Sequence, residues 1–407
     1  MKKLLLITLP LYMAAGNLSV LLDNTIENKL VESSIYNVES VKKQYESVKG
    51  NYKPQISIGT TYSTTNEETA AIADSSFVSY GKIDYVIYDG GAKENIYDSM
   101  ESNINSAKQS LVSLKNKLAL EVINLYYNYL SLKASKKATL QEIKTLSAQQ
   151  NRLEQFLKAG TTTSDEVEKI ISRVQSAHVT LSQIELDMTT LVHKLKYLTN
   201  KDSMVEEGSI INFNKSDKTL KRADIKSLEA STKALKQNAL ASKGAKYPTL
   251  TLKNTFYKYD MNYENTAYES DVDNQNVLKL NLNWKIYDFG ATDDTFDSNH
   301  KKYLSSKSNL EYEKIKSNVD LDLAKKSYEI AKLQIKSASL ALKAANATYE
   351  SIESKYQNGL VENVSYLEAL SEKSAALSQL ERAKNDLEIK KANILYHSGL
   401  NVWEYAK

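Results

Sequence analysis

The sequence predicts a membrane protein of the α+β class, in which four β-strands that face lipid continue into long α-helical coiled coils. Three observations lead to this fold class. Four segments alternate apolar and polar residues, two much longer segments carry helical periodicity, and the whole pattern occurs twice along 407 residues. The repetition means that each half of the chain supplies one strand pair and one helical hairpin.

Composition favours long, uninterrupted elements. The chain has only 3 Pro and 12 Gly, which is far below average usage. Lysines and acids are interspersed and the net charge is +3, so the sequence indicates no nucleic-acid partner. There is no cysteine, which excludes disulfides, thiolate metal sites, catalytic thiols and an N-terminal lipoprotein anchor.

The N-terminus has the layout of a secretory signal peptide. In MKKLLLITLPLYMAAGN two lysines precede an apolar run and then small residues, so we expect residues 1–16 to be cleaved off near Ala15 or Gly16. A buried first helix is the alternative interpretation. Beyond this segment no window approaches the roughly 18 consecutive apolar residues of a membrane-spanning helix. We therefore expect an exported protein without helical membrane spans.

Glycines and prolines mark an internal repeat. Matching residues lie 194 positions apart before the strands (244 − 50) and 199 apart after them (290 − 91): Gly50 and Gly244, Pro54 and Pro248, Gly91 and Gly290, Gly160 and Gly359. The predicted division is a first repeat at 17–200, a linker at 201–221, a second repeat at 222–399 and a tail at 400–407. Each repeat is expected to run helix, strand, strand, long helix, turn, long helix.

The strands alternate strictly between apolar and polar residues. In KLNLNWKIYD the apolar members are Leu280, Leu282, Trp284 and Ile286, and the same period occurs in QISIGTTYS, YGKIDYVIYD and TLTLKNTFY. Strands of about ten residues with one apolar face are typical of a transmembrane barrel. The alternative is a soluble sheet that helices cover on one face. Four strands cannot close a barrel, so the missing strands are expected from other copies of the chain.

After each glycine break the period changes to that of a helix. The clearest stripe follows Gly160 in steps of three and four, as in a coiled coil: Val167, Ile170, Val174, Ala177, Leu181, Ile184, Met188, Leu191, Leu195 and Leu198. In the second half Lys373 interrupts the same heptad. Each long helix fills an interval of 69 residues (160 − 91 and 359 − 290), which is roughly 100 Å of helix.

These features together resemble the TolC-type outer-membrane efflux proteins over essentially all of the mature sequence. The matching motifs are the two-fold repeat, the helical segments LSVLLDNTIENKLVESS and RADIKSLEAS, the hexapeptides IYDGGA and IYDFGA before the long helices, and KYQNGLVENVSYLEA. The resemblance implies a homotrimer with a 12-stranded barrel in the outer membrane, continued by an α-helical barrel in the periplasm.

The resemblance also implies partners. Such proteins are passive ducts without cofactors, which a periplasmic adaptor (membrane fusion) protein and an inner-membrane pump or ABC exporter open at the helical tips. The sequence is consistent with a passive duct, because it has no nucleotide-binding loop and no set of residues typical of a catalytic site. We therefore expect that the protein is not an enzyme. Drug efflux and type I protein secretion both stay open. A periplasmic or secreted coiled-coil structural protein is the alternative of another class.

The tips are the first candidate site. Gly160 and Gly359 stand where one long helix reverses into the next, and Tyr356 belongs to a Tyr-x-x-Gly motif like that of the family tip. The resemblance implies that adaptors dock there and that acidic rings constrict the pore. The candidate acids are Asp165, Glu166, Glu168, Glu362 and Glu368. Stabilisation of helix N-termini is the alternative role, and no basic partner is evident near Val361.

The junctions between strand and helix are the second candidate site. Asp89 and Gly91 in the first repeat correspond to Asp288 and Gly290 in the second, and the acids are expected to cap the long helices. A role in lining the lumen is the alternative. The four histidines lie far apart along the chain, so no metal site is predicted.

Overall fold

A computed structural model describes residues 14–213, 220–268 and 272–405. The chain forms two compact units. The hairpin unit takes the residues up to Ser33, Leu111–Ala223 and the residues from Lys314 onward, and the sheet unit takes Ser34–Ser110 and Asp224–Glu313. Both units therefore draw on both sequence repeats. Most of the predicted signal peptide, residues 1–13, lies outside the described residues.

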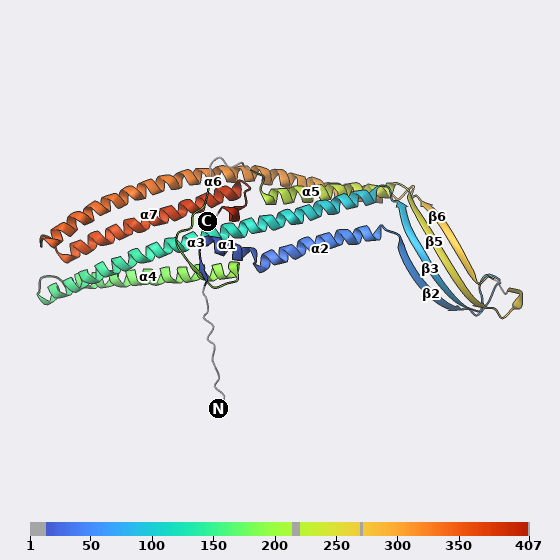
Figure 1. The fold of residues 1–407 in the computed structure, drawn as a ribbon, viewed down its shortest axis with the longest axis horizontal. Helices are drawn as coiled ribbons and strands as arrows, with labels where there is room; N and C mark the ends of the chain where they lie inside the picture. Colours follow the sequence, from blue (N-terminus) through green and yellow to red (C-terminus); the bar gives the residue numbers. More distant parts are fainter. Residues whose placement is uncertain (1–13, 214–219, 269–271, 406–407) are drawn as a thin grey trace, which may run out of the picture. The chain divides into compact units, whose positions relative to one another are not determined.

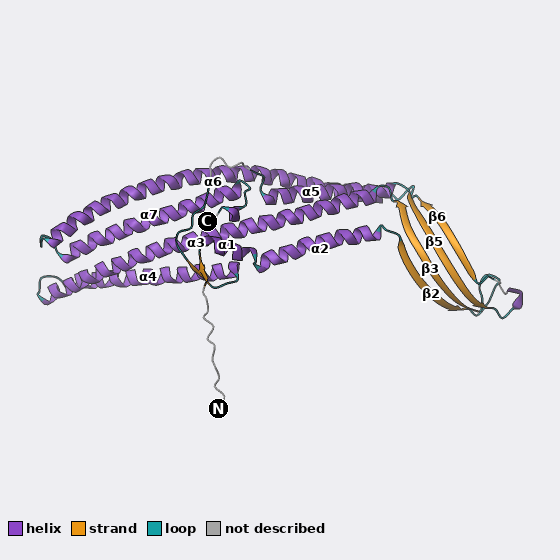
Figure 2. Ribbon diagram, viewed as in Figure 1, coloured by secondary structure: helices purple, strands orange, loops and turns teal. Residues whose placement is uncertain are grey.

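The sheet unit contains the four predicted strands. They are β2 (Gln55–Thr64), β3 (Ser75–Tyr88), β5 (Thr249–Asn262) and β6 (Asn274–Asn283). All neighbours are antiparallel, in the order β2-β3-β5-β6 (Figures 1 and 2). A short 3₁₀ helix, η2 (Thr266–Tyr268), lies between β5 and β6. The sheet is open at β2 and β6, so neither edge has a partner strand within the described chain.

Helices lead into and out of this sheet. Those before the strand pairs are α2 (Lys29–Asn51) and α5 (Ala223–Ser242), the latter followed by the 3₁₀ helix η1 (Lys243–Lys246). The helices after the strand pairs are α3 (Ala92–Lys158) and α6 (Ala291–Gln357), each 67 residues long as the repeat predicts. At 1.5 Å per residue each measures about 100 Å.

The last strand is shorter than predicted. Its alternation suggests a strand as far as Ile286, but β6 ends at Asn283. Asn283 pairs with Thr249, and the residue before Thr249 is Pro248, which has no N–H to extend the ladder. The corresponding β3 does reach Tyr88, with a register shift after Val86. The apolar–polar alternation therefore continues beyond Asn283, whereas the ladder of backbone hydrogen bonds ends there.

The strand register collects the apolar side chains on one face. Tyr85, Leu252 and Leu280 are direct cross-strand partners, and Ile56 is opposite Ile83. Side chains two residues apart share a face. The large apolar side chains of this face are Ile56, Ile58, Tyr62, Phe77, Ile83, Tyr85, Leu250, Leu252, Phe256, Leu278, Leu280 and Leu282. The opposite face carries Ser, Thr, Tyr and Lys for the most part.

The hairpin unit is built from the remaining helices. These are α1 (Leu18–Ile26), α4 (Ser164–Thr199), α7 (Asn363–His397) and the 3₁₀ helix η3 (Val402–Glu404), with the far parts of α3 and α6. A short parallel pair joins β1 (Ala14–Gly16) to β4 (Ser203–Val205). The predicted seam of α4 is confirmed, since its members are buried or half-buried. In the described residues no helix has both the length and the hydropathy needed to cross a bilayer.

The core of this unit surrounds the middle of α3. Val122, Ile123, Tyr126 and Tyr127 are almost fully buried. They lie outside the helical apolar stripe of this segment, which runs through Leu111, Leu114, Leu118, Leu125 and Tyr129 in steps of mostly three and four. They are buried because residues outside the helical hairpins cover α3 from several sides. These residues include Leu18, Val205, Ile211 and Val402, all in the same apolar cluster. The linker predicted at 201–221 therefore contributes apolar side chains to the core, and its residues 214–219 lie outside the described chain.

Candidate functional site

Both tip glycines lie in left-handed turns that end a long helix. Gly160 has φ +70° and Gly359 has φ +71°. Thr161 N donates to Phe156 O at 2.9 Å, and Leu360 N donates to Lys355 O at 2.8 Å. These bonds satisfy the last carbonyls of α3 and α6 in a Schellman arrangement, in which the left-handed residue favours glycine. The two hairpins thus turn in the same way.

The acids of the first hairpin lie at the start of α4. Lys169 Nζ is 3.2 Å from Asp165 Oδ2 and 2.8 Å from Glu166 Oε1, and Glu168 is exposed. Hydrogen bonds from Thr163 and Lys169 hold the pKa of Asp165 below its usual range. All three acids are close to the helix N-terminus, where negative charge is stabilised. The lysine on the same helix compensates two of them.

The acids of the second hairpin contact the first hairpin instead. Arg152 of α3 forms an ion pair with Glu362, which precedes α7, and Gln149 Nε2 donates to Glu368. Thr145 Oγ1 donates to Leu367 O at 2.9 Å. We call Thr145, Gln149 and Arg152, with their partners Leu367, Glu368 and Glu362, the α3–α7 clasp.

The clasp also shows where a basic partner for the tip acids comes from. No basic residue stands near Val361 in the sequence, and Arg152, which pairs with Glu362, belongs to the other repeat. Its guanidinium also lies 5.0 Å from the Phe156 ring centroid. The spacing of Thr145, Gln149 and Arg152 is four and then three residues, which places them on one face of α3. The spacing indicates in the sequence that the three side chains share a face of α3. Only the tertiary structure shows that α7 packs against that face.

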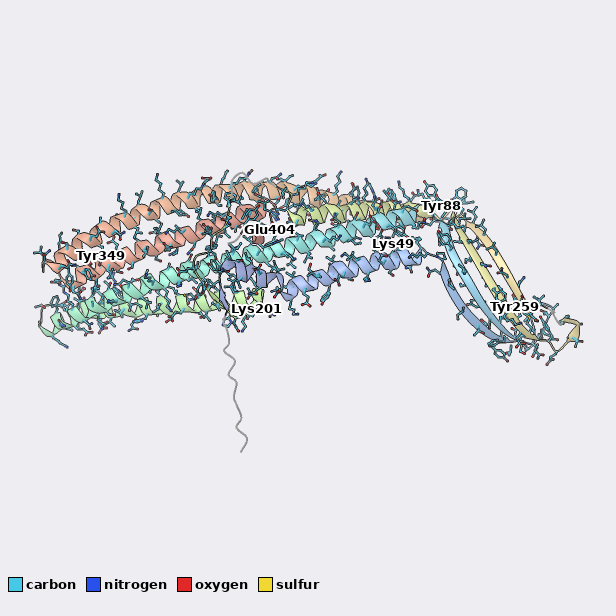
Figure 3. All side chains as sticks on the ribbon, viewed as in Figure 1. Lys49, Tyr88, Lys201, Tyr259, Tyr349 and Glu404 are labelled. Carbon is cyan, nitrogen blue, oxygen red and sulfur yellow. The ribbon has the colours of Figure 1, made fainter. Side chains whose placement is uncertain are left out.

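Tyrosines reinforce the second hairpin. Tyr356 stacks on Tyr366 with ring centroids 4.9 Å apart, and the Tyr366 and Tyr349 hydroxyls are 3.2 Å apart. Hydrogen bonds to Tyr366 and Glu353 raise the pKa of Tyr349 (labelled in Figure 3). Lys373 Nζ lies 4.3 Å from the Tyr349 ring centroid. This cation–π contact explains how a lysine is accommodated at the position where it interrupts the predicted heptad.

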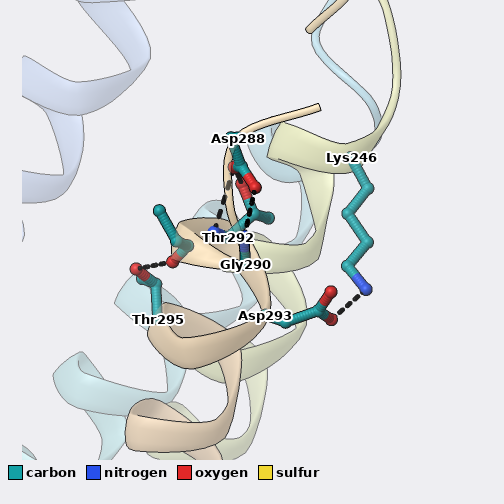
Figure 4. A network of polar contacts seen from close by, with 7 residues as sticks. Lys246, Asp288, Gly290, Thr292, Asp293 and Thr295 are labelled. Atoms are coloured by element: carbon teal, nitrogen blue, oxygen red, sulfur yellow. Dashed lines mark hydrogen bonds and ion pairs between the residues drawn. The ribbon is translucent and has the colours of Figure 1, made fainter. Parts of the chain in front are cut away.

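At the second junction Asp288 caps α6 as expected. Its carboxylate accepts from Gly290 N at 3.2 Å and from Thr292 N at 3.1 Å, and the Thr292 hydroxyl also donates to it (Figure 4). These bonds hold the pKa of Asp288 below its usual range. Lys246, at the end of η1, forms an ion pair with Asp293 in the first turn of α6. Gly290 has φ +88°.

The first junction is built differently. Asp89 lies beside Tyr52, and burial together with the charge and hydrogen bond of Asp89 raises the pKa of that tyrosine. Gly90 and Gly91 have φ +75° and +78°. A Cβ on Gly90 would collide with the backbone of Gly244, while Gly91 faces open space. Gly244, one of the glycines that mark the repeat, therefore also makes a close backbone contact with Gly90.

Among the described residues no group of three or more His, Asp or Glu side chains could hold a metal ion. The predicted site residues instead belong to the tip turns with their tyrosines, the acids of α4, the clasp, and the two junctions. Their described interactions are hydrogen bonds, ion pairs and ring contacts.

Comparison with known proteins identifies the family to which the chain is similar. The profile described as "Outer membrane efflux protein" matches residues 23–201 and 216–399, which is most of the chain in two successive parts. No curated protein sequence matches.

Solved structures share the fold. The CmeC outer membrane channel of Campylobacter jejuni has a TM-score of 0.80 at 15% identity, over 94% of this chain and 85% of that one. The outer membrane protein VceC of Vibrio cholerae has 0.77 at 13%, over 94% and 96%. The MtrE outer membrane channel of Neisseria gonorrhoeae has 0.73 at 14%, over 95% and 89%. With long helices and a four-stranded antiparallel sheet in common and a profile that matches both repeats, the chain belongs to the outer membrane efflux protein family.

Proposed function

We propose that three copies of this chain form a passive exit duct through the outer membrane, opened from the periplasm by a tripartite transport system. The observation that carries the proposal is the sheet of four strands. It has an exposed apolar face and two open edges, and an open edge is not tolerated in lipid. Three sheets joined at β2 and β6 would close a barrel of twelve strands.

The apolar face suits lipid rather than a covering helix. Ile58 is 88% exposed, Leu280 64% and Leu282 68%. A soluble coiled-coil protein would need these side chains to be packed against its own helices. In a barrel the same side chains face the hydrocarbon, while the polar face borders a wet lumen. The exposure therefore supports the duct over the structural protein.

The helices supply the periplasmic part. Each strand pair is followed by a helix of 67 residues and a returning hairpin partner. Three copies would place six such hairpins around a common axis. Gly160, Gly359 and Tyr356 would then lie at the tips, where an adaptor docks. The acids at the tips would border the constriction, and the clasp would hold neighbouring hairpins together until the adaptor and the transporter separate them.

Cargo selection belongs to the inner-membrane partner in this proposal. The duct needs no energy source of its own, and the transporter supplies it. A resistance-type pump with its adaptor would make the chain part of a drug efflux system. An ABC exporter with its adaptor would make it part of a type I secretion system. The genes next to this one distinguish these two cases.

Membrane fractionation and electrophoresis test the duct directly. The protein should be recovered from the outer membrane as a trimer that dissociates only on heating, and the purified trimer should conduct ions in planar bilayers. Recovery in the soluble periplasmic fraction, or a monomer on mild gels, would reject the proposal. A soluble coiled-coil protein is the outcome that this result would favour.

A further inference from the structure

The charged side chains of the sheet are unevenly distributed. The four strands carry six of them: Lys82, Asp84, Lys253, Lys258, Asp260 and Lys279. Lys258 and Asp260 belong to the apolar face, near the loop end of β5. The other four lie on the polar face, and the register puts them in two adjacent rows. We call Lys82, Asp84, Lys253 and Lys279 the basic patch.

The contacts of the patch leave an excess of positive charge. Lys82 Nζ is 3.1 Å from Asp84 Oδ2, while Lys253 Nζ is 3.9 Å from Asp84 Oδ1, beyond hydrogen-bonding distance. Lys279 is exposed on the far side of Lys253. Three lysines surround one aspartate, so the patch carries a net charge of +2 in each chain.

Sheet stability does not account for this arrangement. Lys253 and Lys279 are direct cross-strand partners, and like charges in that relation are destabilising. Serine, threonine or asparagine, which occupy other positions of this face, would avoid the repulsion. An anion close to the patch would offset it. The patch lies nearer the helix end of the strands, because Asp84 pairs with Lys253 only four residues into β5.

We propose that the basic patch makes this level of the duct attract anions, so that anionic cargo is concentrated there on its way out. The inference rests on the proposed function, because the polar face must border the lumen. Three copies would bring the three patches to one level with a combined charge of +6. The acids at the helical tips favour the opposite sign of ion. The helical tips and the level of the basic patch would therefore differ in the sign of the ions that they attract.

The absence of cysteine makes a direct test possible. A single thiol at Thr255, opposite Lys82 and two residues from Lys253, would sense the potential of the patch. Thr61, on the same face, pairs with Val78 and provides the matched control. Its partner Val78 is four residues from Lys82 along β3 (82 − 78), which is roughly 13 Å and beyond the Debye length of about 8 Å at physiological salt.

The measurement is the modification rate of Thr255→Cys and Thr61→Cys trimers in lipid vesicles. Two methanethiosulfonate reagents of similar size are used, one with a sulfonate and one with a trimethylammonium group. The ratio of anionic to cationic rate should be about fivefold higher at position 255 than at 61. It should fall to the value at 61 when Lys82, Lys253 and Lys279 are all replaced by Gln, and it should be kept when they are replaced by Arg.

Each outcome has a separate meaning. Equal ratios at the two positions, or a ratio that survives the triple Gln replacement, would overturn the anion-attracting patch while leaving the duct intact. Failure of both reagents to react at both positions would show that the polar face is not open to water. That result would overturn the proposed duct, and the patch with it. Trimer formation on mild gels verifies that each variant is assembled.

Discussion

Gly90 and Phe289 are equivalent residues of the two hexapeptides, and their surroundings explain why only one is glycine. Both have positive φ, +75° and +56°. Gly90 lies against the backbone of Gly244, where no side chain fits. Phe289 is 88% exposed, and its ring contacts that of Tyr287 in a tilted arrangement with centroids 4.7 Å apart. The difference between IYDGGA and IYDFGA is therefore a difference in how closely the neighbouring backbone approaches.

Replacing Gly90 with Ala should destabilise the protein by more than the roughly 1–3 kcal/mol that an unfavourable backbone conformation costs. The added Cβ would collide with Gly244 as well. Gly91→Ala is the matched control, since its φ is similar but its Cβ would meet open space. Urea unfolding of the purified protein, followed by circular dichroism, compares the two. Equal losses in both variants would contradict the close approach.

The cap at Asp288 predicts a dependence on acid. Its pKa is lowered in the folded protein by the Thr292 bonds, so its stabilising effect is present above the ordinary aspartate pKa of about 3.9. The effect is lost as the pH falls through the lower, folded-state value. The melting temperature of the wild type should therefore fall further below about pH 4 than that of Asp288→Asn. Asp297→Asn, an exposed residue of the same helix, should follow the wild type.

At the scale of elements, the clasp joins helices from different repeats. Arg152 and Glu362 are 37% and 60% exposed, and such pairs typically contribute about 0.2–1 kcal/mol. One pair can therefore change the population of separated hairpins by a factor of only about 1.4 to 5. The hydrogen bonds from Thr145 and Gln149 must therefore also contribute to holding α3 and α7 together.

Arg152→Ala should raise the open probability of single channels in planar bilayers by a factor within that range. The reason is that Glu362 loses its partner on α3 while the tip turns remain. Lys169→Ala is the control, because Lys169 pairs only with acids of its own helix in the contacts described here, and it should leave gating unchanged. Unaltered gating in both variants would show that the Arg152–Glu362 pair of the clasp does not hold the hairpins together.

At the scale of the whole molecule, the two faces of the sheet should respond differently to the same charge. Leu280→Arg puts a charge on the face that we assign to lipid, at a cost of about 2–4 kcal/mol per chain near the bilayer midplane. Asn281→Arg puts the same charge on the opposite face. The first variant should lose most of its heat-resistant trimer, and the second should keep it. Equal yields of trimer from both would contradict the assignment of faces.

Much of the architecture could be predicted because it depends on local periodicity. The strands, the two 67-residue helices and the turns at Gly160 and Gly359 all depend on residue patterns that repeat within a few positions along the chain. The burial of Tyr126 and Tyr127 could not be predicted in this way. They are buried because segments distant in the sequence cover α3, and periodicity describes only one face of one helix.

The element types, their lengths, the repeat and the family resemblance can all be predicted from the sequence, because each depends on the spacing of apolar residues and glycines. The remaining features depend on how the chain packs. The tertiary structure ended β6 where Pro248 has no N–H to donate, paired Glu362 with Arg152, and gathered Lys82, Lys253 and Lys279 into one patch. The physical reason is that these features depend on strand register and on which helices lie side by side, and both are set by contacts between residues far apart in the chain.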